Sequence, residues 1–216
     1  MNNRRKLKQY CNKLIEIRRK YSPADDQHEQ WLVDNCSLLD LRRGDVLDIP
    51  KGRINHKFYF VIEGMIAWVQ YDSQHRKRKI ISIALAEMAI QSSRHLYSTT
   101  PLEGELIALR KCKVLAIPYT ILKEANSQDL CLNIFLDALQ NKSTRQFSIL
   151  REISMITKPL FKRYQYFLEK LPELMPLKIQ ERADLLSISR STLNRLSNPK
   201  YLRKLAEKSS NNEATN

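Results

Sequence analysis

Glycine, cysteine and histidine each occur only four times among the 216 residues of this sequence. So few glycines leave little room for the glycine-rich loops that cradle nucleotide phosphates. The cysteines are too far apart for metal-ligand spacing, and no histidine has an evident nucleophile or metal partner. We therefore expect no enzymatic activity, no metal site and no cofactor. The cysteines are Cys11, Cys36, Cys112 and Cys131, and the histidines are His28, His56, His75 and His95.

Long apolar runs are missing as well. No stretch of about 18 apolar residues occurs, which argues against a membrane-spanning helix in this sequence. The basic N-terminus, residues 1–20, lacks the long apolar core of a secretory signal. Scattered cysteines without a pairing pattern are typical of reduced thiols, so we expect a cytoplasmic protein.

Positive charge is what the sequence has in excess. It carries 37 Lys and Arg against 23 Asp and Glu, a net charge of +14, and its pI is near 9.7. Such a balance predicts attraction to a polyanion, although it says nothing about the fold. Nucleic acid is the common polyanion for such a chain, and an anionic membrane surface is the alternative.

The patterning of the chain changes from helical to β-like near residue 38. Residues 4–20 have the pattern of a basic amphipathic helix, and a second short helix is predicted at 27–35. Between residues 38 and 118, short β-like runs alternate with turn signals, which predicts a sandwich or a barrel. An all-β core without a ligand fits these facts as well as a sensor domain does.

A helical pattern follows from about residue 120 to 156. Its main stripe repeats with the seven-residue spacing of a helix that pairs with another helix. Self-association is one interpretation, and packing of the helix against its own β domain is the other. Pro159 cannot lie inside a helix without cost, so a domain boundary is predicted at residues 157–159. The stripe runs through Leu132, Leu136, Leu139, Ser143, Gln146, Leu150 and Ile153.

Residues 179–196, IQERADLLSISRSTLNRL, predict two helices joined by a tight turn. Ala183 is small where the two helices must approach closely, and Ser189 is placed to cap the second helix. On a helical wheel, Leu193 and Leu196 fall on one side of that second helix. The opposite side is made of Arg190, Ser191, Asn194 and Arg195, with Thr192 near the edge of the apolar side.

The polar side of this second helix has the chemistry of a DNA-reading surface. Guanidinium groups reach guanine edges or phosphates, an amide reaches adenine, and hydroxyls at the helix start donate to phosphate. A solvated face of an ordinary amphipathic helix is the alternative. Residues 158–216 hold twelve Lys and Arg against six Asp and Glu, which favours phosphate contacts and salt-sensitive binding. Residues 1–20 are either a second phosphate contact or a solvated helix face, and the loop HRKRK at 75–79 is interpreted as a solubilising hairpin tip.

The order of a β domain, a long helix and a helix-turn-helix resembles the Crp/Fnr family of bacterial transcription regulators. The resemblance covers nearly the whole chain. Its sensor half is carried by LRRGDVLDIPKG, FYFVIEGMIAWV and ELIALRKCKVLAIPY, and its DNA half by QERADLLSISRSTLNRL. The resemblance implies an α+β fold with a cyclic-nucleotide-binding-like jelly roll, a long dimerisation helix and a C-terminal helix-turn-helix that enters the major groove.

The resemblance also implies a domain plan and a set of partners. It places an effector domain at 1–125, a dimerisation helix at 126–157, and a DNA-binding domain with a disordered tail at 158–216. A homodimer would read a palindromic operator in double-stranded DNA through a recognition helix at 190–197, and RNA polymerase is a further implied partner. Ser191 stands where relatives often carry Glu, so the operator is expected to differ from theirs. The implied DNA contacts are Ser189, Arg190, Ser191, Thr192, Asn194 and Arg195.

The cyclic-phosphate signature of the family is not matched. Cyclic-nucleotide members carry a Gly-Glu pair and, shortly after it, Arg-Ser or Arg-Thr. Here the first site reads Ala86-Glu87, and the second falls near Leu102-Glu103-Gly104. A carboxylate in place of a cation beside a phosphate is electrostatically unfavourable, so we expect neither cyclic AMP nor cyclic GMP. An unidentified small-molecule effector has Ser143, Thr144 and Arg94 as candidate contacts, although Ser143 and Thr144 can instead set the register of a helix pair.

Two positions of the helix-turn-helix also depart from the family pattern. Arg182 sits where an apolar residue is usually buried, although an arginine can bury its stem and keep its charged end in water. Ser187 replaces the common turn glycine, and so few residues follow the recognition helix that a β-wing is expected to be short or missing. These departures leave open a second function, a ligand-binding or protein-interaction module that has lost sequence-specific DNA binding.

Overall fold

The computed structural model describes residues 3–47, 56–72, 77–91, 103–198 and 201. Its contacts divide the chain into two compact units. The first unit holds residues 1–71 and 81–145, and the second holds residues 72–80 and 146–216.

This division passes through a helix and does not fall at the predicted 157–159. The long helix α4 (Leu130–Met155) is divided between Arg145 and Gln146. Pro159 does end the helical pattern, since α4 stops at Met155 and α5 begins after this proline. A helix break is therefore correctly predicted there, but the separation of the units depends on which side chains each half of α4 contacts.

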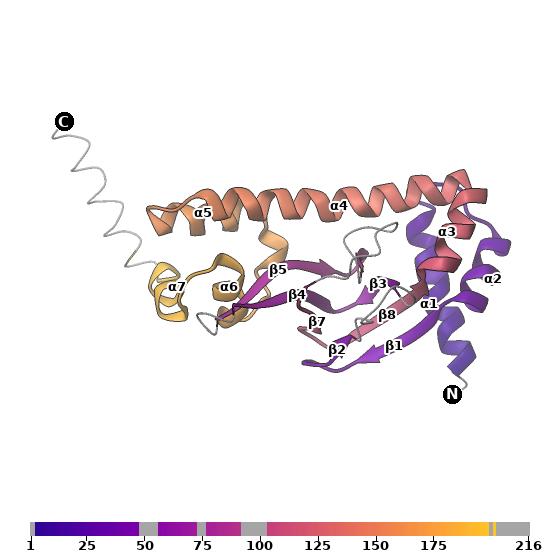
Figure 1. Cartoon of the computed structure of the whole chain (residues 1–216), viewed down its shortest axis with the longest axis horizontal. Helices are drawn as coiled ribbons and strands as arrows, with labels where there is room; N and C mark the ends of the chain where they lie inside the picture. Colours follow the sequence, from indigo (N-terminus) through magenta and orange to yellow (C-terminus); the bar gives the residue numbers. More distant parts are fainter. Residues whose placement is uncertain (1–2, 48–55, 73–76, 92–102, 199–200, 202–216) are drawn as a thin grey trace. The chain divides into compact units, whose positions relative to one another are not determined.

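Short strands make up the central part of the chain, as its alternating pattern predicted. They are β1 (Ser37–Leu41), β2 (Val46–Leu47), β3 (Lys57–Glu63), β4 (Met65–Asp72), β5 (Lys77–Leu85), β6 (Met88–Gln91), β7 (Glu105–Ala108) and β8 (Cys112–Pro118). They form two four-stranded sheets with the strand orders β1-β8-β3-β6 and β2-β7-β4-β5 (Figure 1). Neighbours such as β1 and β8 are far apart in the sequence, so the pairing order is a tertiary property.

Strand β3 is buried on both faces because successive side chains of a strand point to opposite sides of the sheet. Phe58, Phe60 and Ile62 belong to an apolar cluster on the helix side. Tyr59 and Val61 belong to a second cluster that fills the space between the two sheets. This double burial explains why the strand reads FYFVI without polar alternation.

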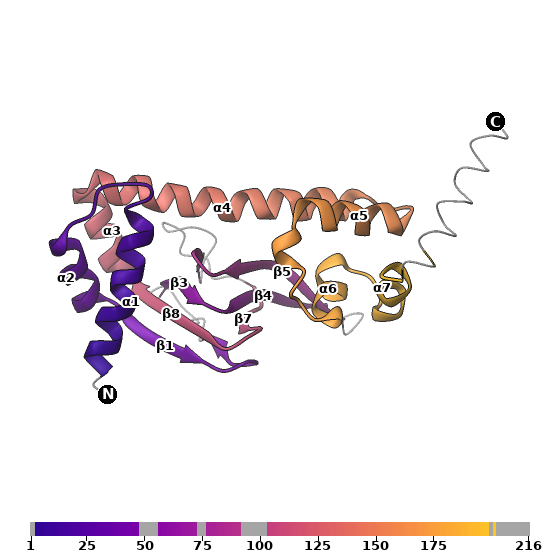
Figure 2. The same ribbon diagram turned by 180° about the vertical axis from the view of Figure 1, so that it is seen from behind.

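Helices α1 (Asn3–Arg18), α2 (Asp26–Asn35) and α3 (Tyr119–Gln128) lie side by side at one end of the first unit (Figures 1 and 2). The cations of α1 and of the turn after it are largely paired with acidic side chains of the same unit. Lys8 Nζ lies 3.3 Å from Glu29, and Lys13 Nζ lies 2.7 Å from Glu63. These pairs favour the interpretation of the basic N-terminal segment as a solvated helix face.

The main stripe of α4 packs against the chain's own first unit over the first half of the helix. Leu132 and Leu139 are buried in the cluster on the helix side of β3, and Leu136 packs against it. Ser143 Oγ donates to the carbonyl oxygen of Ala89 in β6 at 3.3 Å. Packing on the helix's own β domain is therefore confirmed for this half. The exposed large apolar side chains of α4 are Leu130, Ile134, Phe147 and Met155.

An ionic network joins α1, α2 and the link between α3 and α4. Asp129 occupies that link, and its Oδ2 accepts a hydrogen bond of 2.6 Å from Nη2 of the buried Arg18. The same oxygen lies 3.2 Å from Nε2 of His28, whose Nδ1 lies 2.6 Å from the N-cap residue Asp25. Burial acts to raise the pKa of Asp129, but the hydrogen bonds from Arg18 and Leu132 outweigh it and hold this pKa below its usual value.

Replacing Asp129 with asparagine is expected to lower the free energy of unfolding by about 2 kcal/mol at pH 7, because Arg18 then stays buried without its counter-charge. Since the folded-state pKa of Asp129 is lowered, its contribution is present above the unfolded pKa of about 4 and lost as pH falls through the folded value. Urea unfolding from pH 7 to pH 2 should therefore show the wild type and the variant converging. The exposed Asp137 supplies the matched control, Asp137→Asn. A difference that persists unchanged at pH 2 would contradict the assignment.

Four helical segments follow α4 in the second unit. They are α5 (Leu160–Lys170), the 3-10 helix η1 (Pro172–Leu174), α6 (Ile179–Leu186) and α7 (Arg190–Leu196). Tyr164 and Phe167 of α5 stack with ring centroids 6.4 Å apart and are both buried. Tyr166 Oη donates to Glu152 at 2.6 Å, so α5 is tied to the second half of α4. These helices form the support on which α6 and α7 are held.

Candidate nucleic-acid interface

Helices α6 and α7 meet in the arrangement predicted for residues 179–196. Three residues, 187–189, join them. Ala183 is completely buried in α6, and Leu193 and Leu196 anchor α7 in the core of the second unit. Ser187 takes the left-handed conformation with φ of 53°, which a glycine adopts at lower cost. The predicted helix-turn-helix is confirmed, with a serine in the turn position that favours glycine.

Ser189 caps α7 as the sequence predicted. Its Oγ accepts a hydrogen bond of 3.0 Å from the backbone N–H of Thr192. The same Oγ lies 2.9 Å from Ser191 Oγ and 2.8 Å from Thr192 Oγ1. The three hydroxyls therefore form one hydrogen-bonded group at the start of the helix, and the N-terminal end of α7 begins at a defined residue.

Two further residues position this pair of helices and escaped the sequence prediction. Arg163 of α5 donates from Nε to the carbonyl oxygen of Ile156 at 2.6 Å and from Nη1 to that of Leu186 at 3.1 Å. It thereby satisfies a free carbonyl at the end of α6, and burial lowers its pKa. Glu181 is buried and accepts a hydrogen bond of 2.8 Å from the N–H of Lys178 at the start of α6. The Glu at the third position of a helix was an available capping signal, whereas nothing local marks Arg163.

The predicted DNA-contact residues lie on one exposed face of α7. Arg190, Ser191, Asn194 and Arg195 are exposed, and Thr192 is half-buried at the edge of the apolar side. This distribution matches the helical wheel, because Leu193 and Leu196 are the residues of α7 that turn inward. The helix therefore presents two guanidinium groups, an amide and a hydroxyl together on one side.

Arg182 fits the apolar position of α6 in the way expected of a long cationic side chain. It is half-buried, its Nε is buried without a hydrogen-bond partner among the described residues, and its Nη1 lies 4.0 Å from Met175 Sδ. Burying an unsatisfied N–H is unfavourable. The helix-turn-helix therefore tolerates this departure at some cost in stability.

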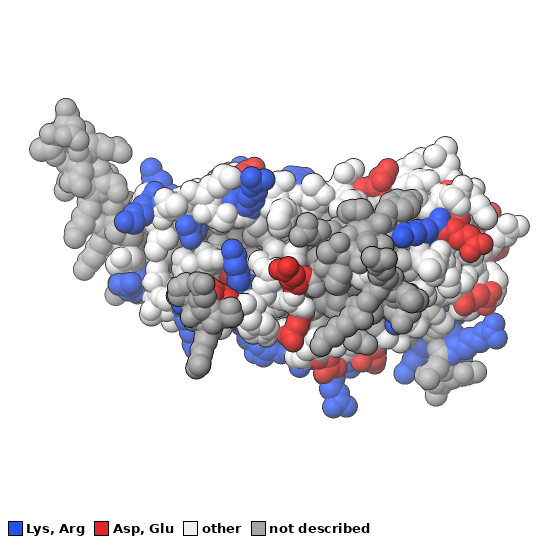
Figure 3. Space-filling model, in the orientation of Figure 1, with Lys and Arg blue, Asp and Glu red and all other residues white. Residues whose placement is uncertain are grey.

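Positive charge gathers on the second unit. On the face shown in Figure 3, Lys and Arg predominate over the part that holds α5 to α7, whereas both signs are mixed over α1 to α3. Arg78, at the start of β5, belongs to the second unit and pairs with Asp184 of α6 across 3.5 Å. Burial raises the pKa of Asp184 despite the opposing effects of Gln180 and Arg78. Arg78 thus has a specific ionic partner, which the interpretation of residues 75–79 as a purely solubilising hairpin tip did not predict. Residues 75 and 76 of that loop lie outside the described residues.

Of the three residues named as effector contacts, the structure describes Ser143 and Thr144. The Ser143 hydroxyl donates a hydrogen bond to the carbonyl oxygen of Ala89 in the same unit, and Thr144 is exposed. Arg94 lies outside the described residues. Ala86 and Glu87 form the short turn between β5 and β6, where the Glu87 carboxylate lies 3.2 Å from Lys20 Nζ. The Ala86-Glu87 turn is thus tied by an ion pair to the segment that follows α1.

Comparison with known proteins identifies the fold. No protein-family model matches the sequence, and no curated protein matches it. A Crp/Fnr-family transcriptional regulator from Eubacterium rectale is similar over 80% of this chain and 82% of its own, with a TM-score of 0.59 and 15% identity. The chain has the Crp/Fnr regulator fold. FixK2 from Bradyrhizobium japonicum is similar over 81% of this chain and 86% of its own chain, with a TM-score of 0.61 and 16% identity. The c-di-GMP-responsive regulator CLP from Xanthomonas campestris is similar over 86% of this chain and 93% of its own chain, with a TM-score of 0.55 and 18% identity.

The resemblance predicted from the sequence is thus confirmed at the level of the Crp/Fnr fold, including its cyclic-nucleotide-binding-like domain. Across the described ranges of this Crp/Fnr-like chain, no helix has the length and apolar character that crossing a bilayer requires. Nor do three His, Cys, Asp or Glu side chains gather at a potential metal site within those ranges.

In this Crp/Fnr-like helix-turn-helix, replacing Ser189 with alanine is expected to destabilise the second unit by about 1 kcal/mol, because the N–H of Thr192 loses its acceptor. Ser189→Asn is the matched control, since asparagine also caps helix N-termini, and it should stay close to the wild type. Thermal unfolding followed by circular dichroism measures both variants. Equal stability of Ser189→Ala and the wild type would contradict a capping role.

Proposed function

We propose that this protein is a DNA-binding transcriptional regulator of the Crp/Fnr type. The observation that carries the proposal is the exposed face of α7, on which Arg190, Ser191, Asn194 and Arg195 stand together. Leu193 and Leu196 hold that helix in the core, so the polar face is rigidly presented. A recognition helix enters the major groove in this way, with Arg reaching guanine and Asn reaching adenine. Ser189 and Thr192 complete the proposed contact set as phosphate-side hydroxyls.

The proposed regulator is a homodimer joined through the helix predicted at 126–157. Leu130, Ile134 and Met155 of α4 are 74%, 47% and 63% exposed, and Phe147 is 47% exposed. Burial of such side chains against a second copy of the helix is favourable. The stripe through Leu132 and Leu139 is already used inside the first unit, so the partner helix contacts other sides of α4. A symmetric dimer places two recognition helices on half-sites about 34 Å apart.

The first unit of the proposed regulator acts as the sensor domain at 1–125, with an effector other than cyclic AMP, and the domain at 158–216 reads the operator. RNA polymerase is the partner through which a bound regulator of this type changes transcription, and the cytoplasm is the compartment in which it meets DNA. The Lys20–Glu87 ion pair supports an effector other than cyclic AMP, because the Glu87 carboxylate of the Ala86-Glu87 site is already paired with a lysine.

A second function is favoured by one observation, the half-buried Arg182 with its unsatisfied Nε. A helix-turn-helix weakened at this position fits a protein-interaction module that no longer reads DNA sequence. In that case α7 would bind DNA only through its charge, with equal affinity for all sequences.

Selection of bound duplexes from a random DNA pool, with and without cyclic AMP at moderate salt, tests both functions. A palindromic motif enriched under both conditions is the expected result. A motif that appears only with cyclic AMP would retain the regulator and overturn the exclusion of that ligand. Salt-sensitive binding without any enriched motif would overturn the regulator and favour the interaction module.

A further inference from the structure

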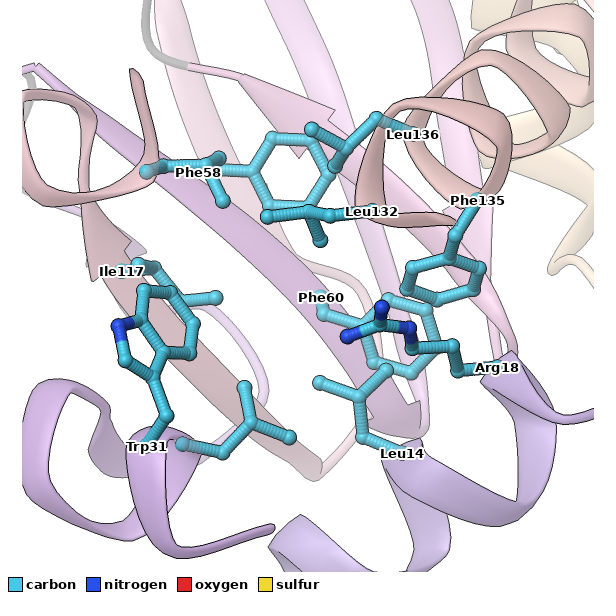
Figure 4. A pocket seen from close by; sticks show the side chains of 11 residues that line it. Leu14, Arg18, Trp31, Phe58, Phe60, Ile117, Leu132, Phe135 and Leu136 are labelled. Atoms are coloured by element: carbon cyan, nitrogen blue, oxygen red, sulfur yellow. The ribbon is translucent and has the colours of Figure 1, made fainter. Parts of the chain in front are cut away.

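An apolar pocket lies in the first unit between the N-terminal helices and the sheet. Side chains from α1, α2, β3, β8, α3 and α4 form its wall (Figure 4). Its β3 residues, Phe58 and Phe60, belong to the cluster on the helix side of the strand. The pocket is therefore separate from the space between the two sheets, which Tyr59 and Val61 help to fill.

One polar group enters this pocket. The guanidinium of Arg18 points inward from α1 between Leu14, Phe60 and Phe135 (Figure 4). Arg18 is only 5% exposed, and its Nη2 donates to Asp129. Its Nε is buried without a hydrogen-bond partner among the residues that the structure describes. A buried N–H in this state is unfavourable, so an acceptor placed beside it would be stabilised.

The surroundings of Arg18 restrict what this acceptor can be. A buried water needs two to four polar partners, but among the lining side chains only Arg18 turns a polar group inward, because the indole nitrogen of Trp31 points away from the pocket (Figure 4). A second anion is disfavoured because Asp129 already neutralises the guanidinium from 2.6 Å and would repel it. A neutral molecule with one acceptor oxygen and an apolar remainder satisfies both limits.

We propose that this pocket binds a small neutral carbonyl compound, a ketone, aldehyde or ester, whose oxygen accepts a hydrogen bond from Arg18 Nε–H. The free volume is about 20 Å³, about the space of one water molecule. Any carbonyl compound is larger than this space, so the proposed ligand has few carbon atoms and its binding requires the half-buried Leu136 to move outward. Because Leu136 and Phe135 lie in the first turns of α4, binding changes contacts at the start of that helix. Its action as the effector of the regulator rests on the proposed function.

Two probes of the same shape test the site on the full-length protein. Acetone carries the acceptor oxygen, and isobutene, dissolved under pressure, has a CH₂ group in its place. Nuclear magnetic resonance follows the Arg18 Nε–H signal and the methyl signals of Leu14, Leu132 and Leu136 during titration. Both probes should shift the methyl signals saturably, with acetone dissociating at about millimolar concentration, and acetone alone should move the Nε–H signal downfield, because only its oxygen accepts the hydrogen bond.

Two variants complete the test. Leu136→Phe fills the pocket while keeping Arg18 and Asp129, and it should abolish the shifts from both probes. Arg18→Met removes the donor, and the ratio of acetone affinity to isobutene affinity should fall about tenfold, the value of one hydrogen bond. Shifts that persist in Leu136→Phe, or an Nε–H signal that acetone leaves unmoved, would overturn the proposal even if Arg18→Met fails to fold. The readout does not involve DNA, so failure of this site is distinguishable from failure of the regulator.

Discussion

Replacing Arg195 with alanine is expected to weaken binding to the selected operator by about tenfold to a hundredfold, a loss of roughly 1–3 kcal/mol. Arg195 is exposed in the last turn of α7, so its removal should leave the stability of the second unit nearly unchanged. A guanidinium that pairs with a guanine edge adds affinity only for the operator. Fluorescence anisotropy with the operator and with a scrambled duplex of equal length measures this difference.

The matched control for this experiment is Arg42→Ala. Arg42 is also an exposed arginine, but it lies in the first unit, and its replacement removes the same charge from the chain. It should leave both affinities close to those of the wild type. Titration at several salt concentrations separates the two roles of Arg195, because loss of a phosphate contact lowers the salt slope by about one. Equal losses for operator and scrambled duplex would assign Arg195 to phosphate, and no loss for either would remove it from the interface.

Replacing Leu193 with alanine is expected to have the largest effect on stability, a loss of about 2–5 kcal/mol. Leu193 is completely buried, and α7 has Leu196 as its other buried residue. At roughly 0.1 kcal/mol per residue, a unit of this size has a total stability on the order of 5–10 kcal/mol. The change therefore removes much of the stability of the second unit, while the sheets of the first unit keep their own core.

Hydrogen exchange read segment by segment measures this effect on the intact chain. Protection should fall in α5, α6 and α7 and persist in β3 and β8. Asn194→Ala is the control for stability, because Asn194 is the exposed neighbour on the same helix and its change should stay within about 0.5 kcal/mol. A loss of protection below 1 kcal/mol in Leu193→Ala would show that α7 is held by contacts other than this leucine.

Local patterns in the sequence were sufficient for the type and place of most elements. The helices at the N-terminus, the β-like runs between residues 38 and 118, and the cap and inner leucines of α7 all follow from the residues within a few positions of each other. Helix and strand periodicities place apolar side chains on one face, and a cap needs only its own first turn. The exposed face of α7 was predictable for the same reason.

The tertiary structure alone decided which distant residues meet. Arg18 and Asp129 are 111 positions apart, and Arg163 reaches the end of α6 across 23 positions, so no local pattern marks either contact. The stripe on α4 shows the same limit, because a seven-residue repeat predicts an apolar seam without naming its partner, and here Leu132 and Leu139 pack on the chain's own sheet. A periodic pattern sets which side of an element is buried, whereas the partner depends on chain segments that the pattern does not contain.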